Sequence, residues 1–315
     1  MLSFLARRLV AAAATLAAAT VVVFVVLEVM PGDPALLMLG TEARPDTLAA
    51  LREQMGLDRP APVRYLAWVS GLLTGDLGRS MTYGVPVAEL VADRLAITVP
   101  LAGLAILAST ALALPLGLYA ASRRGRPGDF GVMAFSQLGV AVPNFWLGIL
   151  LVLVFSIGLG WLPAGGFPGW QAGIGPALAA LVLPAVSLAL TEAAILARVA
   201  RSAVLETLGE DYVRTARAKG LSNRAVLWGH VLRNALIPIV TLVGLQFAFL
   251  MAGTVVIENV FYLPGLGRLL FQAITQRDLI VVKDVTILLA AMVVLVSFAV
   301  DLLYAVIDPR PKAGS

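Results

Sequence analysis

Six long runs of apolar residues divide this chain, and they constrain its fold more than any other feature. They cover residues 9–29, 96–120, 132–157, 177–199, 235–257 and 285–307. A run of about 20 apolar residues has the length of a helix that crosses a bilayer. Closed β-barrels also span membranes, but their strands alternate over about ten residues, and these runs are continuous. The sequence therefore predicts an all-α polytopic membrane protein with six transmembrane helices.

The composition excludes several classes of site. Only 13% of the residues are charged and 60% are hydrophobic, whereas a soluble domain carries about a quarter charged residues. The chain has no cysteine, which excludes disulfides and thiolate-ligated metals, and its one histidine, His230, argues against a histidine-based metal site. A net charge of +4 is typical of basic cytoplasmic loops in a membrane protein, so no nucleic-acid partner is expected.

Basic residues indicate the orientation of the chain. Arg7 and Arg8 precede the first run, which continues to Pro31 and favours an uncleaved spanning helix over a cleaved signal peptide. With the N-terminus inside, the inner loops hold the arginines of 123–126 and seven basic residues of 198–233. The outer loop 158–176 holds no basic residue, and the outer loop 259–284 holds three. Both termini are therefore predicted to be cytoplasmic, since short cytoplasmic loops carry the excess of Lys and Arg.

The long outer loop shows helical periodicity. Two sets of apolar residues each share a helix face: Leu48, Leu51 and Met55, and Leu66, Val69 and Leu73. Turns are predicted at GLDRPAP and at GDLGRS, residues 75–80. We expect two short amphipathic helices that either cap the bundle or form a lip for an external partner.

A charged stretch interrupts the apolar runs at residues 210–238. Residues 202–219 are predicted to form one helix, with acidic residues early and basic residues late, as the helix dipole favours. Glu210 and Arg214 form an i,i+4 pair. Gly220 is expected to end this helix and Ser222 to cap the next one.

This stretch is longer than topology alone requires. Charge runs are usually solvated faces, and arginines in cytoplasmic loops set topology. This region instead has about 35 residues with helical patterns on both sides of a central glycine. Such a long structured element favours a docking surface on the cytoplasmic side. The chain has no GxxxxGK[ST] phosphate loop, so a motor would have to be a separate partner.

The sequence DYVRTARAKGLS followed by HVLRNALIP resembles the EAA loop of ABC importer permeases, in the dipeptide/oligopeptide and nickel branch. Arg214-Thr215-Ala216 occupies the small-residue triplet and Gly220 the glycine. Arginine replaces the glutamate, and HVLR at 230–233 replaces Ile-x-Leu-Pro. Further similar motifs span the chain: LEVMPGDPA (27–35), GDLGRS (75–80), VPNFWLG (142–148), LGWLPAGG (159–166), LPGLGRLLFQAITQRD (263–278) and DLLYAVIDPR (301–310).

The resemblance implies a type I ABC importer fold in a bacterial cytoplasmic (inner) membrane, working by alternating access. It implies that the helix near 211–220 is a coupling helix that docks in an ATPase subunit. The residues carried over are Asp211, Tyr212, Arg214, Thr215, Ala216, Lys219 and Gly220. Its implied partners are a second homologous permease, two P-loop ATPases and an extracytoplasmic solute-binding protein. ATP and Mg²⁺ would be used by the ATPases, and no cofactor is expected on this chain.

Three regions are expected. Residues 1–94 comprise the first spanning helix and the outer loop, 95–307 the transport core with a cytoplasmic coupling loop at about 200–234, and 308–315 a cytoplasmic tail. Polar residues inside spans are functional candidates by default. The candidates for a translocation path are Gln137, Asn144, Glu192 and Gln246. Interhelical hydrogen bonds explain the amides equally well, and pairing with Arg198 is the preferred explanation of Glu192.

The solute is least defined by the sequence. Short peptides are expected, and nickel, glutathione or another small solute could use the same machinery. An ion-driven secondary transporter would need paired acids near the bilayer midplane and repeated halves, and neither is visible. A membrane enzyme would need catalytic side chains at useful spacing, which are also lacking.

Overall fold

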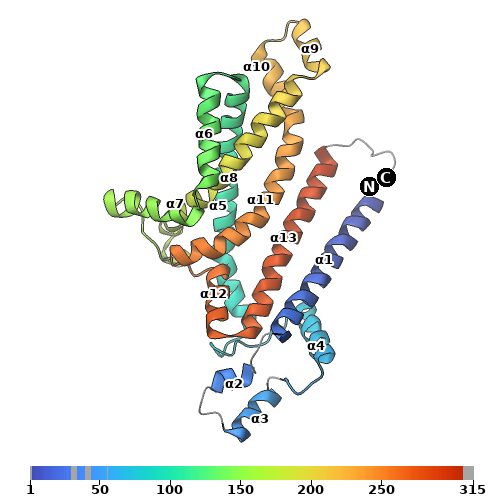
Figure 1. The fold of residues 1–315 in the computed structure, drawn as a ribbon, viewed down its shortest axis with the longest axis vertical. Helices are drawn as coiled ribbons and strands as arrows, with labels where there is room; N and C mark the ends of the chain where they lie inside the picture. Colours follow the sequence, from blue (N-terminus) through green and yellow to red (C-terminus); the bar gives the residue numbers. More distant parts are fainter. Residues whose placement is uncertain (1, 30–33, 40–43, 55, 308–315) are drawn as a thin grey trace. The chain divides into compact units, whose positions relative to one another are not determined.

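The computed structural model describes residues 2–29, 34–39, 44–54 and 56–307, and every regular element in these ranges is a helix (Figure 1). Parts of three expected features lie outside the described residues. They are the centre of the LEVMPGDPA motif, the end of the DLLYAVIDPR motif with the tail 308–315, and Met55.

Five of the six apolar runs form continuous helices long enough to cross a bilayer. They are α1 (Leu2–Val29), α5 (Val87–Ser122), α8 (Ile174–Leu208), α11 (Leu232–Val260) and α13 (Leu279–Ile307). Prolines 115, 184 and 238 lie inside these helices without ending them, as membranes allow where freed backbone groups find other partners. The predicted helical membrane fold is confirmed.

The third run, 132–157, was expected to form one spanning helix, but it does not. It consists of α6 (Pro127–Ala141) and α7 (Asn144–Leu151), and α7 continues into a π-helical turn, η2 (Val152–Gly158). The two halves are bent by 102° and together have the length and apolar character of one span that is broken in the middle or re-entrant. Pro143 explains the bend, because a residue before proline avoids the α region. Val142 accordingly adopts extended angles, φ −92° and ψ 122°.

The described residues form two compact units that are not contiguous in sequence. Unit 1 contains residues up to Thr98 together with Pro264–Leu295, and unit 2 contains Val99–Leu263 and the residues from Val296 onward.

Unit 1 includes the outer-loop helices α2 (Pro34–Leu39), α3 (Pro45–Gln54) and α4 (Ala61–Thr74). The two expected helices are therefore present. The apolar face predicted for α4 is not the packed one, since Leu66 is 66% and Leu73 84% exposed. Instead Tyr65 and Trp68 pack on Phe24 of α1, with ring centroids 5.4 and 6.2 Å from it.

The outer turn GDLGRS is held by a buried carboxylate. Asp278 lies between α12 (Leu266–Gln276) and α13, and it is 1% exposed. Its Oδ2 accepts hydrogen bonds from the Ser80 hydroxyl at 2.5 Å and from the Thr82 backbone N–H at 3.1 Å. Burying a carboxylate requires such donors, so this turn is fixed to the start of α13.

Unit 2 is built around α8, which packs against both α6 and α11 (Figure 1). Half of the buried positions of α8 are alanine. Small residues let helix backbones approach closely in a membrane. A Cβ added to Gly139 of α6 would lie only 2.4 Å from the Cβ of Ala194 in α8, so the α6–α8 contact depends on glycine at that position.

Gly139→Ala is expected to destabilise the protein by about 1–3 kcal/mol through overpacking. Gly131→Ala is the matched control, because it lies on the same helix and its added Cβ would meet nothing within 4 Å. That change should leave stability unchanged or raise it by about 0.5–1 kcal/mol, since alanine favours helix. Thermal unfolding in detergent, followed by tryptophan fluorescence, measures both. Equal shifts in the two variants would contradict the close contact.

Candidate functional site

The charged stretch forms a short helix of its own, α9 (Asp211–Ala218). The expected single helix over 202–219 is wrong, because α8 ends at Leu208 and the chain leaves the helix at Gly209 and Glu210. Glu210 is extended, with φ −67° and ψ 146°. Glycine is a poor helix former, which accounts for the break. In Figure 1, α9 lies just beyond the end of α8.

One face of α9 is apolar and buried. Val213 is 0% and Ala216 7% exposed. They belong to a cluster, called here the loop core, that α5, α8 and α11 also help to form. Its buried members are Ala121, Ala203, Val204, Val213, Ala216, Val226, Val231 and Ala235. The structure therefore places Ala216 against this chain's own helices, where its small side chain lets α9 pack closely.

The other face of α9 is polar and exposed, and we call it the polar face. It comprises five of the seven residues expected to couple to an ATPase: Asp211, Tyr212, Arg214 and Thr215 of α9, and Lys219, the residue that follows the helix. The Arg214 Nη1 lies 3.4 Å from Asp211 Oδ1, with the two side chains 74% and 94% exposed. Arg214 therefore pairs with Asp211 rather than with the expected Glu210. A pair this exposed adds little stability.

Tyr212 links the polar face to α11. Asn234 Nδ2 donates hydrogen bonds of 2.9 Å to the Tyr212 hydroxyl and to the His230 carbonyl. Asn234 was not among the predicted coupling residues, although it belongs to the HVLRNALIP motif. The bond connects a partly exposed aromatic residue of α9 to the first turn of α11.

Gly220 ends α9 as predicted. Its φ is +82°, a left-handed value that favours glycine. The Leu221 N–H donates to the Ala216 carbonyl at 3.3 Å and the Gly220 N–H to the Arg217 carbonyl at 2.9 Å. This is the hydrogen-bond pattern of a Schellman motif.

The predicted cap at Ser222 is also confirmed. Its hydroxyl accepts a 3.2 Å hydrogen bond from the Ala225 N–H and caps α10 (Asn223–Val226). A π-helical turn, η4 (Leu227–Val231), joins α10 to α11. The chain thus runs from helix through a glycine turn to helix, as expected.

Only two of the four translocation-path candidates meet. Gln246 Nε2 donates a 2.8 Å hydrogen bond to the backbone carbonyl of Glu192, and both residues are buried. Gln137 is exposed on α6 and Asn144 is half-buried at the start of α7.

The preferred pairing of Glu192 is wrong, since no ion pair joins it to Arg198 among the described residues. Residues six apart on a helix point about 240° apart around its axis. The Glu192 Oε2 atom is buried and has no hydrogen-bond partner among the described residues.

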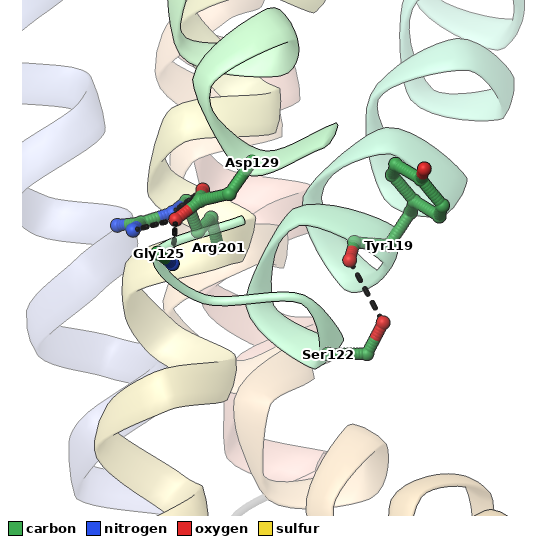
Figure 2. A network of polar contacts seen from close by, with 5 residues as sticks. All are labelled: Tyr119, Ser122, Gly125, Asp129 and Arg201. Carbon is green, nitrogen blue, oxygen red and sulfur yellow. Dashed lines mark hydrogen bonds and ion pairs between the residues drawn. The ribbon is translucent and has the colours of Figure 1, made fainter. Parts of the chain in front are cut away.

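A buried ion pair that sequence reasoning missed joins α6 to α8 near the coupling loop (Figure 2). Arg201 Nε lies 2.5 Å from Asp129 Oδ1, and Arg201 Nη2 lies 2.7 Å from Oδ2. The Gly125 N–H donates to Oδ2 at 2.9 Å. Asp129 is 3% exposed. Such a bidentate pair fixes orientation as well as distance, so it holds the 123–126 turn against α8.

Nearly the whole chain matches two related family models. Residues 113–313 match the family described as "Binding-protein-dependent transport system inner membrane component". Residues 1–102 match a family described as the N-terminal membrane component of binding-protein-dependent transport systems.

Curated relatives match over almost their full length. The chain is 42% identical over 311 residues to a putative peptide transport system permease protein of Brucella suis, covering 98% of this chain and 99% of the relative. A probable peptide ABC transporter permease protein of Sinorhizobium fredii is 40% identical, covering 98% of each chain. A glutathione transport system permease protein of Salmonella choleraesuis is also 40% identical, again covering 98% of each.

Two solved structures share the fold. An inward-facing MetNI methionine ABC transporter aligns with a TM-score of 0.58 and 20% identity, covering 70% of this chain and 96% of that chain. An amino acid ABC transporter crystallised with histidines aligns with a TM-score of 0.53 and 17% identity, covering 69% and 93%.

Proposed function

Because this chain belongs to the family of binding-protein-dependent transport system inner membrane components, we propose that it translocates short peptides as one permease of an ATP-driven importer. Its family makes it a multi-pass inner-membrane transport subunit of an ABC transporter. Such subunits are not enzymes, and ATP hydrolysis lies in separate subunits. An ion-driven secondary transporter is therefore excluded.

The choice of peptides rests on one observation. The relatives that match at 40–42% identity over nearly the whole chain are named for peptide or for glutathione transport, and glutathione is itself a tripeptide. Nickel is the second candidate solute of the same machinery. The described residues contain no group of three or more His, Cys, Asp or Glu that could hold a metal ion, which gives nickel no support from this chain.

Coupling to ATP is assigned to α9. The buried Val213 and Ala216 fix α9 to the loop core, and the polar face is left for a partner. An exposed, charged helix packed on an apolar cluster is suited to docking a partner. When the partner moves α9, the cluster transmits that movement to α5, α8 and α11. In this scheme Asp211, Tyr212, Arg214, Thr215 and Lys219 contact an ATPase, while Ala216 and Gly220 set the position of α9.

The proposed assembly contains this chain, a second homologous permease, two P-loop ATPases and an extracytoplasmic binding protein. The ATPases bind ATP and Mg²⁺. The binding protein delivers peptide to the outer side, ATP binding holds the permeases open outward, and hydrolysis returns them to an inward-open state. This cycle is alternating access, and this chain contributes no cofactor to it.

Transport in proteoliposomes tests the proposal. The complex would be purified through a tag on this chain and reconstituted with ATP inside and with the binding protein outside. We expect uptake of a radiolabelled dipeptide or tripeptide that requires both ATP and the binding protein. Uptake of ⁶³Ni²⁺ under these conditions without peptide uptake would overturn the assignment of peptides.

Arg214→Gln tests the role of the polar face. We expect ATP hydrolysis stimulated by the binding protein to fall about tenfold, the effect of losing roughly 1.4 kcal/mol of charge-assisted contact. Folding should be unaffected because Arg214 is 74% exposed. The matched control is Arg124→Gln, which removes an exposed arginine from the 123–126 turn and should preserve activity. If both variants lose activity equally, the loss results from the lower net charge of the cytoplasmic surface rather than from a lost docking contact.

A further inference from the structure

A groove in unit 2 runs along the last turns of α5 and faces the junction of η4 and α11. Leu114, Leu118, Tyr119 and Ser122 form the α5 side, and Trp228 and Leu232 form the other side. Its volume is 650 Å³, within the range of about 300–1,000 Å³ usual for small-molecule sites. The side chains are nearly all apolar. Both sides of the groove belong to helices that are long and apolar enough to cross a membrane.

The groove ends at a cluster of arginines. Ser122 is the last residue of α5, and the 123–126 turn that follows carries exposed Arg123, Arg124 and Arg126. The Arg123 guanidinium lies over the Tyr119 ring, 5.3 Å from its centroid. The distribution of basic residues puts this end at the cytoplasmic surface. The apolar groove therefore ends at positively charged arginines, at the level of the headgroups of the inner leaflet.

Arg123 differs from Arg201 in its charge balance. The charge of Arg201 is matched by Asp129, whereas no ion pair to Arg123 occurs among the described residues. In Figure 2 the Tyr119 ring, over which Arg123 lies, points away from the Asp129–Arg201 pair. Tyr119 is 44% and Trp228 58% exposed. Amphipathic rings of this kind favour the membrane interface.

We propose that this groove binds an anionic phospholipid of the inner leaflet, with an acyl chain along Leu114 and Leu118 and the phosphate at Arg123. Basic pockets between transmembrane helices on the cytoplasmic side suit such headgroups. The apolar side chains accept the acyl chain, and the charge of Arg123 selects anionic over zwitterionic lipid.

The site adjoins the coupling loop. Leu118 and Leu227 line the groove and also pack against the loop core that holds α9. A bound lipid would therefore contact Leu118 and Leu227 from the groove, while the same two residues pack against the cluster that holds Val213 and Ala216. Its occupancy braces the support of α9, independently of which solute is transported.

Photo-crosslinking on the complete transporter tests the site. The probe is phosphatidylglycerol with a diazirine in one acyl chain, diluted into phosphatidylcholine nanodiscs, and labelled peptides are identified by mass spectrometry. We expect labelling on residues 110–122 and 227–232, displaced by excess phosphatidylglycerol and not by phosphatidylcholine. Arg123→Gln should reduce this labelling about fivefold, which corresponds to about 1 kcal/mol for one arginine near an anionic headgroup.

The control is Arg126→Gln, which removes the same charge from the same turn, keeps the contact of Arg123 with Tyr119, and should leave labelling within twofold of the wild type. Three results would overturn the proposal. Equal displacement by the two lipids would show that charge plays no part. Equal loss in the two variants would show general attraction to the turn. Absence of labelling in the groove, with cross-links from Trp228→Cys to the second permease, would show that protein covers it.

Discussion

Gly220→Pro is expected to reduce ATP-driven uptake to background while the chain still inserts into the membrane. Gly220 has a φ of +82°, and proline holds φ at about −65° and has no N–H. The change therefore removes the hydrogen bond to the Arg217 carbonyl and forces the turn between α9 and α10 to another path. The polar face of α9 would then be misplaced relative to its partner. Uptake in proteoliposomes and membrane insertion would be measured on the same preparation.

Two alanine variants make this result specific to the turn. Gly220→Ala keeps the N–H and meets nothing within 4 Å, so its cost is the left-handed backbone alone, about 1–2 kcal/mol. We expect partial activity from it. Gly229→Ala changes a nearby glycine in η4 that also has open space around it and should transport normally. Wild-type uptake by Gly220→Pro would show that the position of α9 does not matter for transport.

Asp129→Ala is expected to destabilise the protein by about 3 kcal/mol or more, because removing one partner of a buried pair leaves the other charge uncompensated. The Arg201 side chain is only 21% exposed, so water cannot fully replace the carboxylate. The turn that holds Gly125 would also lose its acceptor. The shift in thermal unfolding temperature of the detergent-solubilised protein measures this loss.

A double-mutant cycle separates the ion pair from other effects of the substitution. Combining Asp129→Ala with Arg201→Met removes both partners, and the double variant should be more stable than the sum of the single losses predicts. We expect a coupling of about 1–3 kcal/mol. If the two losses simply add, the contact in Figure 2 does not contribute as an ion pair.

Local features of the sequence predicted local structure. The apolar runs predicted the spans because about 20 apolar residues suffice to define a transmembrane helix. Gly220 and Ser222 were identified as a stop and a cap because their hydrogen bonds reach only three to five residues along the chain. The bend at Pro143 was missed because Pro100, Pro115, Pro184 and Pro238 lie inside helices that continue past them. Only the extended angles of Val142 distinguish it.

Contacts between distant residues could not be predicted from one sequence. Asp129 and Arg201 are 72 residues apart, and Trp68 donates to Asp284 across 216 residues. The packed face of α4 depends on Phe24 of α1, which no periodicity within α4 indicates. The residues expected to contact an ATPase were selected by their position in the motif. Ala216 was among them, but it lies on the buried side of α9. The motif alone could not show this, because which side of α9 is buried depends on its packing against other helices.

The most direct measurement asks what the polar face touches. Because the chain has no cysteine, Arg217→Cys provides a single thiol for a maleimide–benzophenone reagent in the assembled, active transporter; Arg217 is exposed on α9 and is not one of the residues assigned to the ATPase contact. We expect a photo-crosslink from residue 217 to a P-loop ATPase, and none from Arg124→Cys. If the thiol at 217 is modified in an active complex and forms no cross-link to an ATPase, α9 is not the docking helix and the proposed coupling mechanism is wrong.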